Sequence, residues 1–185
     1  MALFYGSAVS STGIPNQNTN PAGDSAGFSH ARVRRTYSVY SNASPYVQIT
    51  NDILVFGLFK PSDRIIDVKF FCDGAGTNGA LNIGVHSVEK ANGALSFTAI
   101  DADLFASAKA TGTAILHGAA AATVFTESTT LTDSDRGKAL WKLADIGGGT
   151  YTADPGGIWA ITGVFTVIED ATSVYRVEIE YVAGD

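Results

Sequence analysis

Residues 74–79 (GAGTNG) are the first candidates for chemistry, because they match the GxGxxG pattern of dinucleotide sites. Asp101 follows about twenty residues later, where such sites carry an acidic residue. A dinucleotide site also needs a helix directly after the glycines, since the helix N-terminus holds the pyrophosphate. Residues 80–85 instead alternate between apolar and polar side chains, as a strand does. We therefore interpret 74–79 as a glycine turn and expect no cofactor.

A second motif, GDSAG at residues 23–27, matches GxSxG with Ser25 in the nucleophile position. A nucleophile elbow needs a strand before the serine and a helix after it. The flanking sequences NQNTNPA and FSHARVRR are typical of neither. His30 is close in sequence, but catalytic triads are not assembled from neighbours in a flexible segment. A hydrolase that uses Ser25 stays a third hypothesis, which labelling by a serine-reactive probe would support.

The remaining histidines and the cysteine do not form a recognisable site. His86 is predicted on the polar face of a strand and His117 in an Ala/Gly-rich loop, so they do not have metal-ligand spacing. Cys72, the one cysteine, is predicted on the apolar face of a strand as a small buried hydrophobe. We predict no metal site.

Two aspartate pairs precede short apolar segments. Asp101 and Asp103 precede residues 104–108, and Asp133 and Asp135 precede KALWKLA at 138–144. We interpret both pairs as helix caps rather than as a carboxylate dyad or a calcium site. The second pair falls in a capping-box pattern that begins at Thr132. The sequence therefore predicts two short helices, no catalytic residues and no enzyme activity.

The rest of the chain has the pattern of strands. Residues 53–59, 65–72 and 81–85 are separated by turn sequences and predict an antiparallel meander. In the second of these, one face is apolar and the other polar; the apolar face carries Ile66, Val68, Phe70 and Cys72. Further strands are predicted from Val33, over 123–126, and in a closing hairpin of 157–168 and 173–182. About eight strands without a βαβ rhythm predict an all-β, jelly-roll-like antiparallel β-sandwich.

Composition limits the function classes. The 185 residues are 45% hydrophobic and 16% charged, which suits one domain with a large core and a surface partly covered by other subunits. The net charge of −6 argues against nucleic-acid binding by bulk charge. No apolar run approaches the ~20 residues of a membrane helix, and the start MALFYGS lacks the features of a signal peptide. We expect synthesis in the host cytoplasm and no membrane contact.

Residues 1–31 are predicted to form an extended N-terminal arm, and residues 32–185 the β-sandwich domain. The arm is rich in Ser, Asn, Gly and Pro, yet it carries more apolar residues than a linker needs: Leu3, Phe4, Tyr5, Ile14 and Phe28. We interpret it as a segment that becomes ordered against a partner or a sister subunit. Arg32, Arg34 and Arg35 come directly after the arm in the sequence. They form either a solvated strand end or a cluster that docks on an acidic partner through carboxylate contacts.

Taken together, the chain resembles the capsid decoration, or cement, proteins of tailed bacteriophages. The order and spacing of several segments carry the likeness, and no single motif does: DILVFGLFKPSDRIIDVKFFCD, LNIGV, DADLFASA, KALWKLA, DPGGIWAITGVFTV and VEIEYV. These segments lie within residues 47–182, so the arm is not covered. The resemblance implies a non-enzymatic virion protein, often a homotrimer, that binds the outer surface of the capsid and clamps neighbouring major capsid proteins.

The alternative is a jelly-roll module of a virion that binds carbohydrate or a receptor. Such a module would need Trp141 and Trp159 as exposed stacking platforms, whereas both lie in apolar runs and are expected in the core.

Overall fold

The computed structural model describes residues 3–5, 33–41, 49–74, 78–91, 94–168 and 173–184, of which 3–5 are described by their backbone. Within these residues the chain forms eight strands, one α-helix and two 3-10 turns. The strands are β1 (Leu3–Tyr5), β2 (Val33–Ser41), β3 (Ile53–Phe59), β4 (Arg64–Cys72), β5 (Ala80–Ala91), β6 (Ala94–Ala110), β7 (Ile158–Val167) and β8 (Val174–Val182). The helix is α1 (Leu140–Ile146), and the turns are η3 (Ala120–Ala122) and η4 (Asp133–Asp135).

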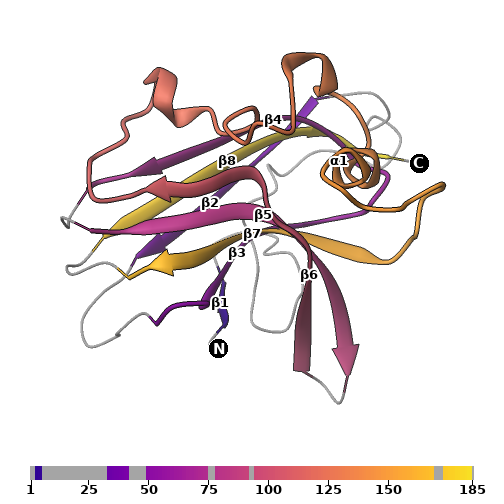
Figure 1. The fold of residues 1–185 in the computed structure, drawn as a ribbon, viewed down its shortest axis with the longest axis horizontal. Helices are drawn as coiled ribbons and strands as arrows, with labels where there is room; N and C mark the ends of the chain where they lie inside the picture. Colours follow the sequence, from indigo (N-terminus) through magenta and orange to yellow (C-terminus); the bar gives the residue numbers. More distant parts are fainter. Residues whose placement is uncertain are drawn as a thin grey trace, which may run out of the picture.

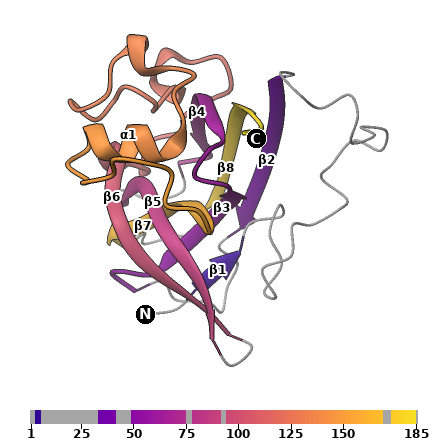
Figure 2. The same ribbon diagram turned by 90° about the vertical axis from the view of Figure 1, so that its right-hand side faces the viewer.

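The strands form two sheets that pack face to face (Figure 1). One sheet has the order β1-β3-β7-β5-β6, and the other has the order β2-β8-β4. Neighbouring strands are antiparallel except β1, which pairs with β3 in parallel. Figure 2 shows the two layers from the side, with α1 near one end of them. The predicted all-β sandwich is confirmed.

The predicted meander of the three central strands is wrong. β3 and β5 lie in the five-stranded sheet, where both pair with β7, whereas β4 lies in the other sheet and pairs with β8. The chain therefore crosses between the layers at each of the two turns. An alternating pattern shows which face of a strand is buried, but it does not show which strand pairs with it.

The predicted closing hairpin is wrong for the same reason. β7 pairs with β3 and β5, while β8 lies between β2 and β4 in the opposite sheet. In β8, Tyr175, Val177 and Ile179 face the core, whereas β7 is buried on both faces from Trp159 to Gly163. β5 and β6 pair antiparallel from Ala91 and Ala94 inward, on either side of an Asn-Gly sequence that favours a two-residue hairpin turn.

The predicted helix over 104–108 is a strand. These residues belong to β6, and the side chains of Leu104 and Phe105 are buried in the main core. The β5–β6 register jumps from Ile83 opposite Ala106 to Val85 opposite Asp101, so the intervening β6 residues bulge out of the ladder. The bulge directs the side chains of Leu104 and Phe105 into the core, so these residues are buried without forming a helix. The strand predicted over 123–126 is also wrong, since Thr123 makes one isolated bridge to Lys69.

The second predicted helix is confirmed as α1, and Leu140 and Leu143 are buried as expected. The capping box lies one element earlier. The Thr132 hydroxyl and the Asp135 carboxylate close η4, with the Thr132 N–H donating to Asp135 Oδ2 at 2.7 Å. The chain between β6 and α1 runs along β4 and forms isolated bridges to that strand, so it protects the β4 edge.

The main core fills the space between the sheets. Its largest fully buried side chains include Phe56, Phe70, Phe105, Phe165 and Tyr175. In β4 a bulge between Ile65 and Asp67 shifts the alternation, so Ile65 is fully buried and Ile66 is not. Cys72 is buried as predicted.

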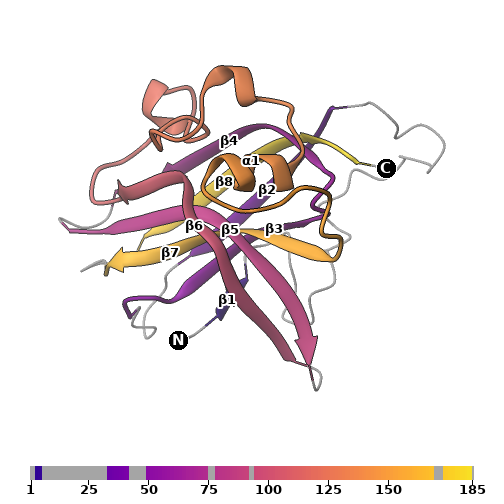
Figure 3. The same cartoon turned by 45° about the vertical axis from the view of Figure 1, so that its right-hand side comes forward.

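The β5–β6 ribbon extends past the body of the sandwich (Figure 3). A second, smaller apolar cluster supports its base. Phe97 of β6 packs there with Ile53 and Val55 of β3 and Ala160 of β7.

Candidate functional site

The arginines of β2 point to opposite faces of the three-stranded sheet. Arg35 lies on the outer face, where its guanidinium pairs with Glu180 and, at 3.3 Å, with Glu178 of β8. Side chains alternate along a strand, so Arg34 points to the inner face together with Ser38. The Arg35 ion pairs raise the pKa of its guanidinium, with the Glu180 hydrogen bond as the largest cause. One of the two arginines is therefore already paired within its own sheet.

The outer face of this sheet carries a continuous series of alternating charges. Lys69 Nζ of β4 lies 3.4 Å from Glu178 Oε1 and 3.8 Å from Glu180 Oε1. Farther along, Arg136 donates to Asp67 Oδ1 at 2.6 Å and to Asp133 at 2.9 Å. The series joins β2, β8, β4 and η4. Its charges are mutually compensated, so this face stabilises the sheet and offers little free charge to a ligand.

Arg34 is not compensated in this way. Its side chain is half-buried opposite Tyr181, and its Nε is buried without a hydrogen-bond partner. Within the described part of the chain, no carboxylate forms an ion pair with it. Ser38, 2% exposed on the same face, also has a hydroxyl without a partner there. A buried polar group without a partner costs about 1–3 kcal/mol. The inner side of β2 therefore holds unused donors at the point where the predicted arm joins the sandwich.

The other predicted partner-binding residues divide into two groups. Leu3, Phe4 and Tyr5 form β1, which extends the edge of the five-stranded sheet beside Ile53–Val55. Ile14, Phe28 and Arg32 lie outside the described residues, as does most of the predicted 1–31 arm. Binding of a partner by any of these residues, and the boundary between arm and domain, stay predictions.

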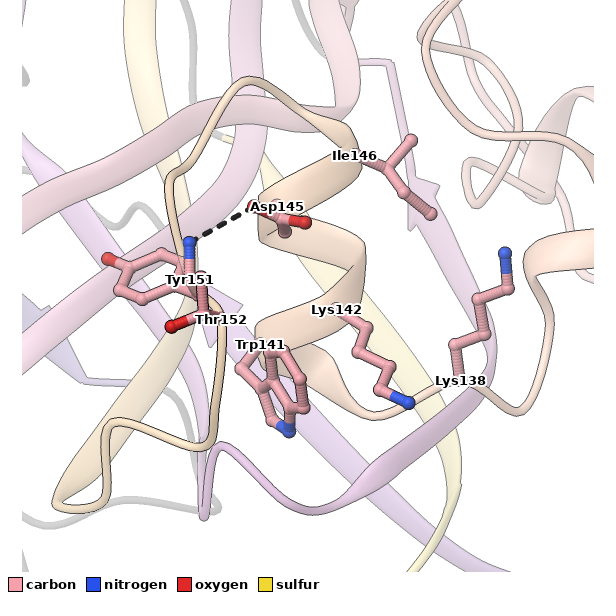
Figure 4. Close-up of a pocket in the computed structure, with 7 residues that line it drawn as sticks. All are labelled: Lys138, Trp141, Lys142, Asp145, Ile146, Tyr151 and Thr152. Carbon is pink, nitrogen blue, oxygen red and sulfur yellow. Dashed lines mark hydrogen bonds between the residues drawn. The ribbon is translucent and has the colours of Figure 1, made fainter.

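A surface hollow of about 450 Å³ lies beside α1. It is lined by residues of the helix, of the segment before it and of the loop after it: Lys138, Trp141, Lys142, Asp145, Ile146, Tyr151 and Thr152. Figure 4 shows the Trp141 and Lys142 side chains projecting from the same helix, with Tyr151 and Thr152 on the loop beside Trp141. Asp145 Oδ1 accepts the Tyr151 N–H at 3.0 Å and ties the loop to the helix.

The two tryptophans have different environments. Trp159 is 3% exposed in the core, as predicted, while Trp141 is half-buried and its ring lines the hollow. The sequence contains a signal that would have located this site. Lys138, Trp141, Lys142 and Asp145 have the i, i+3, i+4, i+7 spacing of one helix face, opposite Leu140 and Leu143.

The prediction for His86 is wrong. This side chain is 4% exposed, and its Nδ1 lies 2.8 Å from the Thr162 hydroxyl of β7. Burial lowers the pKa of His86. Thr162 provides a polar partner, which explains how a histidine is accommodated in an apolar sheet. His117 is exposed, as expected for a loop residue, and its ring stacks on Phe71 with centroids 5.2 Å apart.

The first aspartate pair does not cap a helix. Asp101 and Asp103 lie in the β6 bulge, where Asp101 Oδ1 accepts the Asp103 N–H at 3.3 Å. Burial raises the pKa of Asp101. Asp135 caps the 3-10 turn η4 and not α1, whose N-cap is Ala139: its hydrogen bond with Lys138 and those with Thr132 lower its pKa to about 2.

The structure tests the GxGxxG motif but not the GxSxG motif. The glycines at 74–79 lead into strand β5 and not into a helix, so the GxGxxG segment lacks the helix N-terminus that a pyrophosphate needs. The GxSxG segment with Ser25, and His30, lie outside the described residues. Among the described residues, no three His, Cys, Asp or Glu side chains are grouped to hold a metal ion. No helix in the described part of the chain is long and apolar enough to cross a membrane.

These features define a β-sandwich protein with a compensated charged sheet face, an aromatic hollow, and an edge-strand arginine that no described carboxylate pairs with. No family model and no curated protein matches the sequence. Two solved structures are similar to it. One is the capsid of Ralstonia phage GP4, with 13% identity, 100% of this chain and 99% of that chain covered, and a TM-score of 0.49. The other is the capsid asymmetric unit of cyanophage Pam1, with 14% identity, coverages of 92% and 97%, and a TM-score of 0.44. The assignment of this chain as a β-sandwich rests on the pairing of its own strands.

Proposed function

We propose that this chain is a non-enzymatic structural protein of a tailed-phage virion, which binds the outer surface of the capsid and cements neighbouring major capsid proteins. The sequence resemblance to decoration proteins supports this proposal, as does the all-β sandwich. The single observation that carries it is the half-buried guanidinium of Arg34 on edge strand β2, which forms no ion pair among the described residues.

Arg34 is suited to a protein partner that supplies a carboxylate. A guanidinium binds a carboxylate through two parallel hydrogen bonds, and the low-dielectric setting of a half-buried group strengthens such a pair. Among the described residues the Arg34 Nε has no hydrogen-bond partner, and an acidic side chain of the capsid subunit would supply one on binding. Arg35 differs, because Glu178 and Glu180 already occupy it.

The arm and the oligomeric state complete the proposal. The apolar residues of the arm contribute contact area in addition to that of Arg34, and a homotrimer multiplies each weak contact by its symmetry. On a lattice of repeated subunits, avidity then exceeds the affinity of any single site.

The test is co-sedimentation of the purified chain with expanded phage heads that lack it, followed by heating of the decorated heads. We expect saturable binding and a higher temperature of head disruption. A chain that lacks residues 1–31 is expected to keep its fold and to bind more weakly. Heads that neither retain the chain nor gain heat resistance would contradict the proposal, and unchanged occupancy by the shortened chain would contradict the role of the arm.

A further inference from the structure

The hollow beside α1 presents both signs of charge around one aromatic face. Lys138 Nζ is paired with Asp135 at 2.6 Å, and Asp145 uses Oδ1 to hold the Tyr151 N–H. Lys142 Nζ lies over the Trp141 ring, 5.2 Å from its centroid, and this ring contact leaves its N–H donors for a further acceptor. The rim thus combines ammonium donors with a carboxylate acceptor and carries no strong net charge.

We propose that this hollow binds one sugar ring of a glycan, with Trp141 as its stacking platform, and that the exposed Lys142 side chain turns from the ring to the sugar hydroxyls on binding. A sugar ring has an apolar C–H face that matches an indole, and each of its hydroxyls both donates and accepts hydrogen bonds. Its hydroxyls can therefore accept from Lys142 or donate to Asp145, both of which line the hollow. An acidic peptide would meet the Asp145 carboxylate, and a basic peptide would meet the two lysines.

The site is formed before a ligand arrives. The loop after α1 is tied to the helix by the Asp145 contact to Tyr151 and by the Gly149 N–H donating to Ala144 O at 3.0 Å. The Tyr151 ring packs on the buried Trp159 ring, with centroids 5.4 Å apart. Because these contacts fix the loop, a ligand does not have to order it, and the volume of about 450 Å³ is in the usual range for small-ligand sites.

This proposal does not depend on capsid attachment. The hollow belongs to α1 and its loop, while Arg34 belongs to β2 in the three-stranded sheet. A chain that decorates a capsid and also binds surface glycans would hold the virion near a cell. Loss of either activity leaves the other intact, so the two proposals fail separately.

The test is titration of the full chain with the methyl glycosides of glucose, galactose, mannose and N-acetylglucosamine, followed by amide and indole signals in ¹H–¹⁵N NMR spectra. We expect at least one glycoside to shift the Trp141 indole N–H and the amides of Lys142, Asp145 and Thr152, with a Kd of about 1 mM. Trp141→Ala is expected to weaken binding about tenfold or more, and Trp141→Phe less, because a smaller aromatic face remains.

Lys142→Met serves as the second variant, because its exposed side chain can change without disturbing the core. We expect it to weaken binding while the spectrum stays that of a folded chain. The control is Leu116→Ala, which removes an exposed apolar side chain elsewhere and should bind as the parent does. The proposal is overturned if no glycoside shifts these signals at about ten times the expected Kd, if the shifts persist in Trp141→Ala, or if an acidic peptide shifts them and the glycosides do not.

Discussion

Arg34 and Arg35 are adjacent on β2, yet their guanidinium groups have different environments. Arg35 lies on the outer face of the sheet and is paired with Glu178 and Glu180, whereas Arg34 lies on the inner face with a buried Nε that has no partner among the described residues. The alternation of a strand produces this difference from two identical residues. The proposed attachment to a capsid depends on this difference, because only an unpaired guanidinium gains a partner on binding.

The first prediction compares the two arginines in the free chain. Arg34→Met removes a half-buried charge that has no ion-pair partner among the described residues, so the free energy of unfolding should stay the same or rise by about 1 kcal/mol. Arg35→Met removes an exposed guanidinium from Glu178 and Glu180, whose carboxylates Lys69 still faces, and should lower the free energy of unfolding by about 0.2–1 kcal/mol. Urea denaturation of both variants and the parent measures the difference. A marked loss of stability in Arg34→Met would show that Arg34 already has a partner within the chain.

The second prediction concerns acid and His86. Burial lowers the pKa of His86 below its usual 6.5, so in the window just below that value the unfolded chain binds more protons than the folded chain. The contribution of the neutral His86 to the free energy of unfolding is fully present above pH 6.5 and is lost as the pH falls toward the folded-state pKa. His86→Gln keeps a polar partner for Thr162 but does not titrate. The fall in stability across this window should therefore be smaller in His86→Gln, as urea unfolding at several pH values would show.

The third prediction concerns the capping carboxylate at η4. The Asp135 pKa is about 2, below its ordinary value of 3.8, because Lys138 and Thr132 bond the charged form. The contribution of the Asp135 carboxylate to the free energy of unfolding is present above pH 3.8 and is lost as the pH falls toward 2. Asp135→Asn should remove this part of the acid sensitivity, and unfolding curves measured at about pH 5 and about pH 2 would show it. Equal acid sensitivity in the parent and the variant would contradict the role of this carboxylate.

The fourth prediction compares two strand glycines. A Cβ at Gly84 would lie 2.1 Å from the Asp101 carbonyl oxygen, which belongs to the backbone of the β6 bulge. A Cβ at Gly163 would lie 2.6 Å from the Phe56 ring, which can rotate away in part. Gly84→Ala should therefore cost the full overpacking penalty of about 1–3 kcal/mol or more, and Gly163→Ala less. Calorimetric unfolding of both variants tests the order, and the reverse order would contradict the position of the bulge.

The strands are predictable from the sequence because one buried face imposes an alternating pattern. The pattern in β4 and β8 predicts their buried faces correctly, with a one-residue shift at the Ile65–Asp67 bulge. The pairing of strands is not predictable in this way. Proximity in the sequence favours one sheet for neighbouring strands, whereas β3, β4 and β5 alternate between two. Pairing depends on contacts between distant segments, and these leave no local pattern.

The candidate sites are predictable only in part. The arginine cluster at 32–35 is apparent from its charge, but the pairing of Arg35 requires β8, which is more than a hundred residues away in the sequence. The apolar residues around Trp141 predict a core position for it. A helix of seven residues has only one buried face, so Trp141 lies between the face of Leu140 and Leu143 and the solvent.

The most direct test of capsid attachment is the affinity of Arg34→Met for phage heads that lack the chain, measured by co-sedimentation beside the parent and Arg64→Met. Arg64 is an exposed arginine of β4, so its variant loses the same charge at another place. We predict that Arg34→Met raises the Kd about tenfold or more and that Arg64→Met binds as the parent does. Equal binding by Arg34→Met and the parent would contradict the proposed attachment.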